Sequence, residues 1–498
     1  MLSDYTKYRL YEILPGALIW FSIVGGILLS FFAPLWMIYF VIVYDIYWVH
    51  RVVYFSFFLT LSLREYRRAL RTDWFAKLQE EKPQWREYVH AIFLPVYDED
   101  EAVVRTTLEG LLKSSLPAKQ MLVVLAGEER KLDHFGAFCY ALKEEYGDKF
   151  FDFLVTIHPS DLPDEIPGKG SNIHYAGQKV KEYIDAIGYN YDRVIVSAFD
   201  IDTIVHPHYF SALSYTYLSV PNPTRASYQP FALYNNNMWE SPAVLRIMAF
   251  GTTFWLLTEL PRVDRMVTFS SHSMSFRALV DVGFWEKRIV SEDSRIYWQC
   301  VLKYDGDYRT YPIFLPVSMD TVRDETFWRS CKNLYKQQRR WAWGTEHIPF
   351  MLWNLPKHPG ISWKRKWYYM FNMIEGKFSW GMTAIILLVF GRLPLLVAGD
   401  EVRSTVLFQN TPHILEWLMG GAMLGLVFSM TYSLLLLPPR PSSVRSYTFL
   451  IMVLQWLLLP ISLIFMSSLP AIDAQTRLML GRYLGFNVSA KKRKIITA

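Results

Sequence analysis

Two aspartates separated by one residue are the first feature of the sequence that could do chemistry. Asp200 and Asp202 stand in the stretch FDID, directly after the apolar run RVIVSA. In an extended segment, residues two apart project to the same side, so both carboxylates could approach one divalent cation or its water ligands. Such a cation would neutralise the charge that builds on a leaving diphosphate. A turn with two solvated aspartates is the alternative, and the spacing alone does not separate the two.

A second acidic group stands at the start of a predicted amphipathic helix. The stretch VSEDSRIYWQCVL begins with Ser291, Glu292 and Asp293. A carboxylate there could act as a general base towards an attacking hydroxyl, because the helix start favours its ionised form. Ser-Glu-Asp is also an ordinary helix N-terminus, so this group would not suffice alone.

A third group stands in the stretch YKQQRRWAWG. On a helix, Gln337, Arg340 and Trp341 share a face, whereas Gln338 and Arg339 point elsewhere. That face carries an amide, a permanent cation and a large aromatic ring. An interfacial helix with aromatic anchors is the alternative.

Short apolar runs must position these residues. The runs HAIFLPVY, MLVVLAG, FDFLVTI and RVIVSAFD are of strand length, and they alternate with helix-like segments such as EAVVRTTLEGLLKSS and NIHYAGQKVKEYIDAIG. This alternation predicts a mostly parallel sheet covered on both faces. In such sheets ligands bind beyond the carboxyl ends of the strands, where Asp200 follows the fourth run.

Segments of bilayer length flank this α/β region. Residues 17–33 and 35–63 predict a helical hairpin that turns near Pro34, and the basic stretch REYRRALR after it places the α/β region in the cytoplasm. Further spans are predicted at residues 379–397, 414–437 and 447–469, after a basic and aromatic interfacial stretch, WKRKWYYMFNM. The net charge of +6 fits basic residues beside anionic lipid, so no nucleic-acid partner is expected. The three scattered cysteines indicate reduced thiols.

The charge pattern contains one conflict. Basic residues around Lys364 and in the loop from Arg440 to Arg445 indicate the cytoplasmic side, and the acidic loop at residues 400–401 indicates the other side. A full crossing by residues 447–469 would then leave the basic tail around Lys491 outside. Pro460 lies within this segment, so we expect either a kinked, re-entrant helix or a miscounted crossing elsewhere.

In chain order, the motifs LPVYDE, DID, SED and QQRRW resemble those of the membrane-bound family 2 glycosyltransferases. This family includes cellulose, chitin and hyaluronan synthases and ceramide glucosyltransferases. The resemblance covers residues 88–344. It implies a GT-A domain, which is an α/β nucleotide-diphospho-sugar transferase domain, here inserted between α-helical transmembrane segments.

The resemblance also implies roles for single residues. Asp200 and Asp202 become the site of a Mg²⁺ or Mn²⁺ ion and the diphosphate, and Asp293 becomes the catalytic base, supported by Glu292. The QxxRW motif, which lies under the donor diphosphate and the acceptor sugar in the family, matches Gln337, Arg340 and Trp341. An arginine can pair with diphosphate charge, a glutamine can donate a hydrogen bond, and a tryptophan offers a flat face to a sugar ring.

Softer matches add further donor-binding candidates. Lys169 and Asn172 stand in PGKGSNIHYA, which resembles the family's lysine segment, although a surface loop is an alternative. Lys491 stands in FNVSAK, which resembles the FxVTxK gating loop of cellulose synthases, with a basic tail as the alternative. Asp98 follows the first run, near the usual nucleotide pocket. The family's aspartate-rich stretch after the second strand is replaced by EERKLD, so Glu128 or Glu129 could hold the base, and its identity stays open.

These inferences predict five regions: a transmembrane hairpin (1–72), a cytoplasmic glycosyltransferase domain (73–345), interfacial helices (346–378), transmembrane helices (379–470), and an amphipathic segment with the possible gating loop (471–498). We expect a multi-pass protein of the plasma membrane. It would be an inverting, metal-dependent enzyme of cell-envelope polysaccharide biosynthesis that builds a β-linked glycan from a nucleotide sugar, expected to be a UDP-sugar. Transfer of one sugar to a polyprenyl phosphate or a sphingolipid is the second interpretation, and a non-catalytic membrane scaffold is the third. The oligomeric state is left open.

Overall fold

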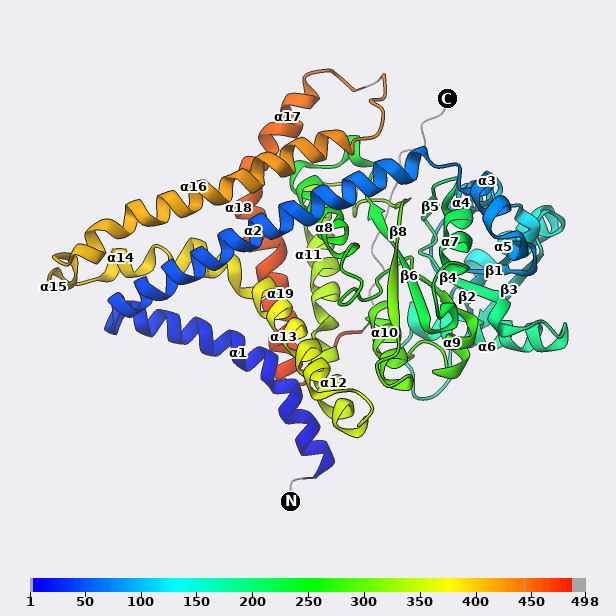
Figure 1. Cartoon of the computed structure of the whole chain (residues 1–498), viewed down its shortest axis with the longest axis horizontal. Coiled ribbons are helices and arrows are strands. Elements are labelled where there is room, and N and C mark those ends of the chain that lie inside the picture. Colours follow the sequence, from blue (N-terminus) through cyan, green and yellow to red (C-terminus); the bar gives the residue numbers. More distant parts are fainter. Residues whose placement is uncertain (1–2, 443, 486–498) are drawn as a thin grey trace.

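A mixed sheet forms the centre of the α/β domain in the computed structural model, which describes residues 3–442 and 444–485 (Figure 1). Its eight strands have the order β3-β2-β1-β4-β7-β6-β8-β5. Strands β3, β2, β1 and β4 are parallel, and the short strands β5 and β7 run against their neighbours. The four runs predicted as strands coincide with β1 to β4. The strands span Val89–Pro95 (β1), Met121–Glu128 (β2), Asp152–His158 (β3), Val194–Ala198 (β4), Ile204–Val205 (β5), Ala226–Leu233 (β6), Ser273–Ser275 (β7) and Arg309–Ser318 (β8).

Helices cover both faces of the sheet, because alternate residues of the buried strands point to opposite sides. In β1, Ile92 and Leu94 belong to one hydrophobic cluster, whereas Ala91 and Phe93 belong to another. The first cluster includes residues of α3, α4, α5, α7 and α8, and the second includes residues of α6, α9, α10 and α12. These helices span Trp74–Glu81 (α3), Glu101–Leu112 (α4), Leu132–Tyr146 (α5), Lys169–Ala186 (α6), Tyr209–Tyr217 (α7), Ala243–Glu259 (α8), Phe276–Asp281 (α9), Glu292–Lys303 (α10) and His347–Asn354 (α12).

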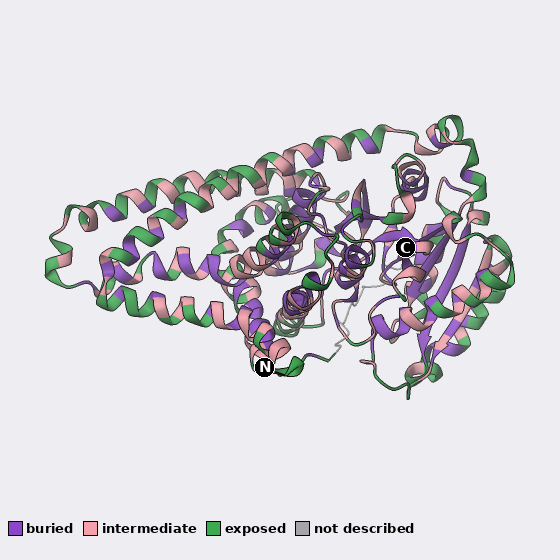
Figure 2. Cartoon of the chain, turned by 60° about the horizontal axis from the view of Figure 1, so that its bottom comes forward, coloured by how far each residue is buried: buried purple, intermediate pink, exposed green. Residues whose placement is uncertain are grey.

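Five helical segments in the described part of the chain are long and apolar enough to cross a membrane. Helices α1 (Asp4–Phe32) and α2 (Pro34–Arg71) form the predicted hairpin, with Ala33 between them. The interfacial stretch WKRKWYYMFNM is instead the start of a long helix, α13 (Trp363–Ile385), which continues through a π-helical turn towards α14 (Leu393–Val397). After the short α15 (Asp400–Arg403), α16 (Val406–Leu435) returns to the α/β domain. Figure 2 shows many exposed residues along these long helices, in contrast to the buried sheet.

The fifth segment, Thr448–Met479, lies across the other four instead of beside them (Figure 1). It consists of α17 (Thr448–Leu454), α18 (Leu459–Leu463) and α19 (Leu469–Met479), joined by 3₁₀ and π-helical turns. Trp456 stacks on Phe254 of α8 with ring centroids 6.2 Å apart, and Asp473 of α19 pairs with Arg339 of α11 (Phe327–Ala342). The segment is therefore interrupted on both sides of α18, which contains Pro460, and packs against helices of the α/β domain.

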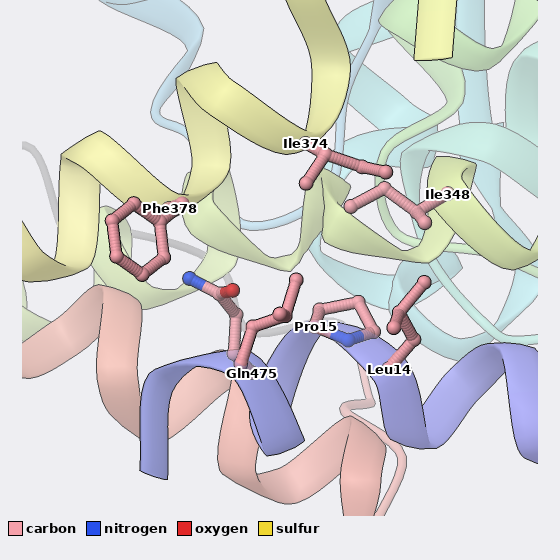
Figure 3. A pocket seen from close by; sticks show the side chains of 7 residues that line it. Leu14, Pro15, Ile348, Ile374, Phe378 and Gln475 are labelled. Atoms are coloured by element: carbon pink, nitrogen blue, oxygen red, sulfur yellow. The ribbon is translucent and has the colours of Figure 1, made fainter. Parts of the chain in front are cut away.

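Helices near the two ends of the described chain, α1 and α19, pack against each other. A Cβ atom on Gly16 would lie 2.6 Å from Met479 Cβ, so glycine permits α1 to approach α19 closely. Beside this contact lies a shallow apolar pocket (Figure 3). Its lining comes from α1, α12, α13 and α19 and consists of Leu14, Pro15, Leu18, Ile348, Ile374, Phe378 and Gln475.

Candidate active site

The ammonium group of Lys169 joins the two acidic motifs. Its Nζ lies 2.8 Å from Asp200 Oδ1, 3.0 Å from Asp293 Oδ2 and 4.0 Å from Glu292 Oε1. Burial by itself lowers the pKa of this ammonium, but the charges of Asp200 and Asp293 outweigh burial and the pKa is raised. Lys169 is therefore a charged link between the turn after β4 and the start of α10.

Two glycines explain why Lys169 takes this position. Gly168 has φ of 154°, a conformation that favours glycine, and it ends the loop before α6. A Cβ atom on Gly170 would lie 3.1 Å from Glu286 O and 3.3 Å from Glu292 Cβ, so a side chain at this position would crowd α10 where α6 begins. Lys169 is thus the first residue of a helix and largely buried, and the surface-loop alternative is wrong.

The two aspartates of FDID stand in a turn and not in an extended segment. The backbone N–H of Thr203 donates to Asp200 O at 3.0 Å, which closes the turn just beyond β4. Asp202 is buried, and its Oδ2 accepts from the backbone N–H of Asp320 at 3.2 Å. The predicted geometry was wrong because the strand ends at Ala198, before the motif.

The residues at this turn fit a divalent cation held partly by a substrate. In the described part of the chain, no three histidine, cysteine, aspartate or glutamate residues gather as a metal site. Mg²⁺ and similar ions, however, are commonly held by one or two carboxylates together with substrate phosphates and water. Asp200 and Asp202 supply such carboxylates, and a cationic group, the ammonium of Lys169, already lies against Asp200.

Glu292 and Asp293 have different surroundings in the first turn of α10. The side chain of Asp293 is 20% exposed, whereas that of Glu292 is 4% exposed. Burial, followed by the charge of Asp293, raises the pKa of Glu292 to about 7. Asp293 thus combines access to solvent with a cationic neighbour, which suits a base, and Glu292 lies beneath it.

A histidine that the sequence motifs do not include lies beside Asp293. The Nδ1 of His272 is 3.0 Å from Phe269 O and 3.8 Å from Asp293 Oδ1. Burial lowers the pKa of His272, which keeps the ring neutral, so Nδ1–H donates to the Phe269 carbonyl. A single histidine in SSHSMS carries no pattern that could have revealed it.

A polar network behind α10 fixes the direction of this helix. The hydroxyl of Ser291 donates to Glu346, and Trp343 Nε1 donates to the same carboxylate at 3.0 Å. His347 Nδ1 accepts from Arg295 Nε at 3.2 Å, so its Nε2 carries the proton and donates to Ser294 Oγ at 2.7 Å. Ser291 thus joins α10 to the segment after α11 instead of capping its own helix.

Helix α11 carries the QQRRW stretch to the same region. Burial raises the pKa of the Tyr234 hydroxyl, the charges of Asp200 and Asp202 raise it further, and the charge of Arg340 lowers it. The charge of Arg340 also lowers the pKa of Glu292. The ring centroids of Tyr234 and Trp341 lie 6.4 Å apart. The structure therefore brings Arg340 near the acidic cluster, together with Tyr234, which sequence reasoning missed. Trp341 lies beside Tyr234.

Arg339 agrees with the predicted arrangement of the QQRRW stretch, and Gln338 does not. Arg339 points elsewhere, as expected, and donates to Asp473 Oδ2 at 2.8 Å. Gln338 is buried and lines one cavity together with Gln337 and Trp341, so the predicted separation of Gln338 from that face is wrong. Gln338 lies in the last turns of α11, where residues of α8 line the same cavity.

The remaining candidates have contacts outside the Lys169 cluster. Asn172 is buried and its Nδ2 donates to Ala126 O of β2 at 2.7 Å, which holds α6 on the sheet. Asp98 is exposed and pairs with Lys131 at 2.7 Å. Glu128 pairs with Arg130, and Glu129 accepts from the backbone N–H and hydroxyl of Ser160. Lys491 lies outside the described residues.

No family model matches the chain, and the comparison with curated proteins gives no match either. Among solved structures, the mannosyltransferase PcManGT from Pyrobaculum calidifontis, in complex with GDP-Man and Mn²⁺, is similar with 12% identity and a TM-score of 0.41, over 76% of this chain and 97% of that chain. Residues 1–349 of S. aureus TarS are similar with 11% identity and a TM-score of 0.35, over 69% and 89% of the two chains.

GalNAc-T7 with UDP, GalNAc and Mn²⁺ is also similar, with 9% identity and a TM-score of 0.32 over 58% of each chain. The chain is thus a mixed α/β protein that resembles glycosyltransferases loosely, with several long apolar helices in addition.

Proposed function

We propose that the protein is a membrane-bound inverting glycosyltransferase of family 2, with a GT-A domain that uses a nucleotide-diphospho-sugar, expected to be a UDP-sugar. The observation that carries the proposal is the link made by Lys169. Its ammonium lies 2.8 Å from Asp200 and 3.0 Å from Asp293. The expected diphosphate site and the expected base therefore both contact the same lysine. Donor and acceptor could therefore meet between them.

Asp293 would act as the base. It takes the proton of an acceptor hydroxyl while that oxygen forms a bond to the anomeric carbon, and the bond from that carbon to the diphosphate oxygen breaks on the opposite face. A single displacement of this kind converts an α donor into a β product, and no covalent nucleophile is needed. His272 lies beside Asp293, with Nδ1 3.8 Å from Asp293 Oδ1, but its Nδ1–H donates to the Phe269 carbonyl.

Positive charge would stabilise the departing nucleoside diphosphate. Lys169 and Arg340 are the nearby cations of the chain, and Arg340 stands on α11, whose Gln337 and Trp341 would contact the donor or the acceptor sugar. Asp200 and Asp202 would hold a Mg²⁺ or Mn²⁺ ion. When bound, that ion would neutralise part of the diphosphate charge.

The acceptor distinguishes two versions of this activity. The QQRRW motif and the long apolar helices favour a growing polysaccharide over the transfer of one sugar to a lipid. Both versions place the catalytic domain on the cytoplasmic side of the plasma membrane, with the four long helices crossing it. A non-catalytic scaffold would need neither the buried lysine nor the acidic pair beside it.

The proposal is tested with the full-length protein in lipid nanodiscs, Mn²⁺ or Mg²⁺, and a panel of radiolabelled nucleotide sugars. We expect one sugar to be transferred by the wild type and not by Asp293→Asn. An unchanged rate in Asp293→Asn would refute the assigned base, and no binding of any nucleoside diphosphate by the wild type would refute the glycosyltransferase assignment.

A further inference from the structure

One carboxylate outside the sequence motifs joins the two segments that carry SED and QQRRW. Glu346 ends the short 3₁₀ turn Trp343–Glu346, which follows α11 directly. One of its oxygens accepts from the hydroxyl of Ser291, the residue before Glu292, and the other accepts from Trp343 Nε1 at 3.0 Å. Glu346 therefore receives one hydrogen bond from the start of α10 and one from the end of α11, and bonds to an ionised acceptor are the stronger kind.

The backbone of Glu346 and the next residue hold the other side of the same helical turn. Arg295 Nη2 donates to Glu346 O at 3.4 Å, and Arg295 Nε donates to His347 Nδ1 at 3.2 Å. His347 Nε2 donates in turn to Ser294 Oγ at 2.7 Å. The polar residues on both sides of the acidic pair in α10 are thus tied to residues 346–347, and the acidic pair itself is left to face Lys169.

Apolar packing keeps the Trp343–Glu346 turn in place. Trp343 is 2% exposed and belongs to one hydrophobic cluster with Val290, which stands just before Ser291, and with three residues of α19. A Cβ atom on the neighbouring Gly344 would lie 3.1 Å from Lys377 Nζ of α13. The turn is therefore packed between the start of α10, α13 and α19, and a closely packed element has little freedom to shift.

We propose that Glu346 is a positioning residue that holds the base Asp293 at a fixed place relative to the donor-binding face of α11. The inference rests on the proposed glycosyltransferase function and adds a residue that the sequence motifs do not include. Ser291 and Trp343 transmit the effect, because each is bound to a different oxygen of Glu346 and stands two residues from a proposed site residue. The displacement requires the base, the acceptor hydroxyl and the anomeric carbon to align, and a misplacement of about 1 Å can cost about 10²-fold in rate.

The two donors define what the side chain at position 346 must supply. The indole N–H of Trp343 can only donate, whereas the hydroxyl of Ser291 can turn and accept. An amide at position 346 can therefore accept from Trp343 and donate to Ser291, so Glu346→Gln keeps both links. Glu346→Ala keeps neither link, and Ser291→Ala removes only the link to α10.

The test separates rate from binding and from stability. Full-length Ser291→Ala, Glu346→Ala, Glu346→Gln and Tyr304→Phe are prepared in lipid nanodiscs beside the wild type. Tyr304→Phe is the matched control, because it removes a hydroxyl that donates to Asp281 Oδ2 at 2.8 Å at the opposite end of α10. The kcat and KM of transfer are measured with the nucleotide sugar that the panel identifies. Calorimetry gives the dissociation constants of UDP and GDP with Mn²⁺ and the thermal unfolding midpoint of each variant.

We expect Ser291→Ala and Glu346→Ala to lower kcat by at least about tenfold, because Asp293 no longer keeps its place. The donor KM and the nucleotide dissociation constants should stay within about twofold of wild type, since Lys169 and Arg340 are unchanged. Glu346→Gln should keep kcat within about threefold of wild type and Tyr304→Phe within about twofold, even where the unfolding midpoint falls.

Two results would contradict the role of Glu346. A normal kcat in Ser291→Ala, or an equal loss of kcat in Glu346→Gln and Glu346→Ala, would overturn the inference, and the activity of the wild type would leave the glycosyltransferase proposal intact. Absence of both nucleotide binding and transfer in the wild type would overturn both.

A second measurement does not depend on activity. Hydrogen exchange of the full-length protein in nanodiscs, followed by mass spectrometry, reports how firmly the first turn of α10 is held. We expect peptides that contain residues 291–296 to exchange at least about fivefold faster in Ser291→Ala than in the wild type, while peptides of β1 and β4 stay unchanged. Equal exchange of the α10 peptides in both proteins, or faster exchange in every peptide, would overturn the inference.

Discussion

Lys169 Nζ lies 2.8 Å from Asp200 Oδ1 and 3.0 Å from Asp293 Oδ2, so one ammonium neutralises carboxylates from two separate motifs. The charge of the cluster is therefore partly balanced before any substrate arrives. A diphosphate that enters beside Asp200 competes with that carboxylate for Lys169, and a divalent cation competes with Lys169 for the carboxylate. Binding of either ligand therefore depends on breaking a contact between Lys169 and these aspartates.

Asp293→Asn should lower glycosyl transfer by about 10²–10⁴-fold, the usual contribution of a general base. Nucleotide binding should persist, since Lys169 and Arg340 remain. The rates of transfer and the dissociation constant for the nucleoside diphosphate are measured on the same nanodisc sample. Asp307→Asn, which alters an exposed aspartate paired with Arg225, is the control and should match the wild type.

Lys169→Met should destabilise the apo protein, because Asp200 and Asp293 then repel each other without a cation. Loss of hydrogen bonds to charged groups costs about 1.5–3 kcal/mol each, and partial exposure of both aspartates reduces this cost. Mn²⁺ should raise the thermal unfolding midpoint of this variant more than that of the wild type. Equal Mn²⁺ effects on both proteins would argue against a cation site at Asp200.

Glu292 should make the folded protein less stable as the pH rises. Its pKa is raised from 4.5 to about 7 by burial and by Asp293, with Lys169 and Arg340 opposing the shift. Between these two values the folded protein binds a proton that the unfolded chain has released, so this contribution is present at low pH and is lost as the pH rises through about 7. Glu292→Gln should flatten the dependence of the unfolding midpoint between pH 5 and pH 8, whereas Glu182→Gln, at an exposed pair with Lys179, should not.

Arg339 and Asp473 should couple energetically. Their side chains lie 2.8 Å apart and are each about one-fifth exposed. Asp473 also pairs with Arg477. A double-mutant cycle with Arg339→Leu and Asp473→Asn should give a coupling of about 0.5–3 kcal/mol in the free energy of unfolding. The exposed pair of Arg329 and Glu325 is the reference and should give less than about 0.5 kcal/mol.

Cysteine labelling in intact cells should place both ends of the fifth segment on one side. Single cysteines at the exposed positions Ser446 and Gly485 should react only after permeabilisation, whereas a cysteine at the exposed Asp400 should react from outside. The three native cysteines are buried and give little background. Labelling of Gly485 from outside would mean that the segment crosses the membrane.

The parts of the fold that depend on local pattern were predictable. Strands β1 to β4 are continuous apolar runs, and the hairpin of α1 and α2 turns at Pro34, because burial and proline chemistry act over a few residues. The short β7 was not predictable, since Ser273–Ser275 has no apolar pattern and is a strand only because β4 and β6 flank it.

The candidate site was predictable in its residues and not in its contacts. The acidic motifs were found from their residue types and spacing, and Lys169 from the resemblance of its segment to that of the family. The contact between them depends on Gly170 and the approach of α6 to α10. His272, Tyr234 and the partners of Glu346 each stand singly in the sequence. Their significance arises only from residues that the fold brings near.

The transverse fifth segment packs against two helices of the α/β domain, α8 and α11. Trp456 stacks on Phe254 of α8, and Asp473 pairs with Arg339 of α11. Both helices line the cavity beside Trp341. In the proposed membrane-bound enzyme, this segment would connect the bilayer to one wall of that cavity. Changes in bilayer thickness or lateral pressure would reach that wall directly, so lipid composition should tune turnover even when the substrates are saturating.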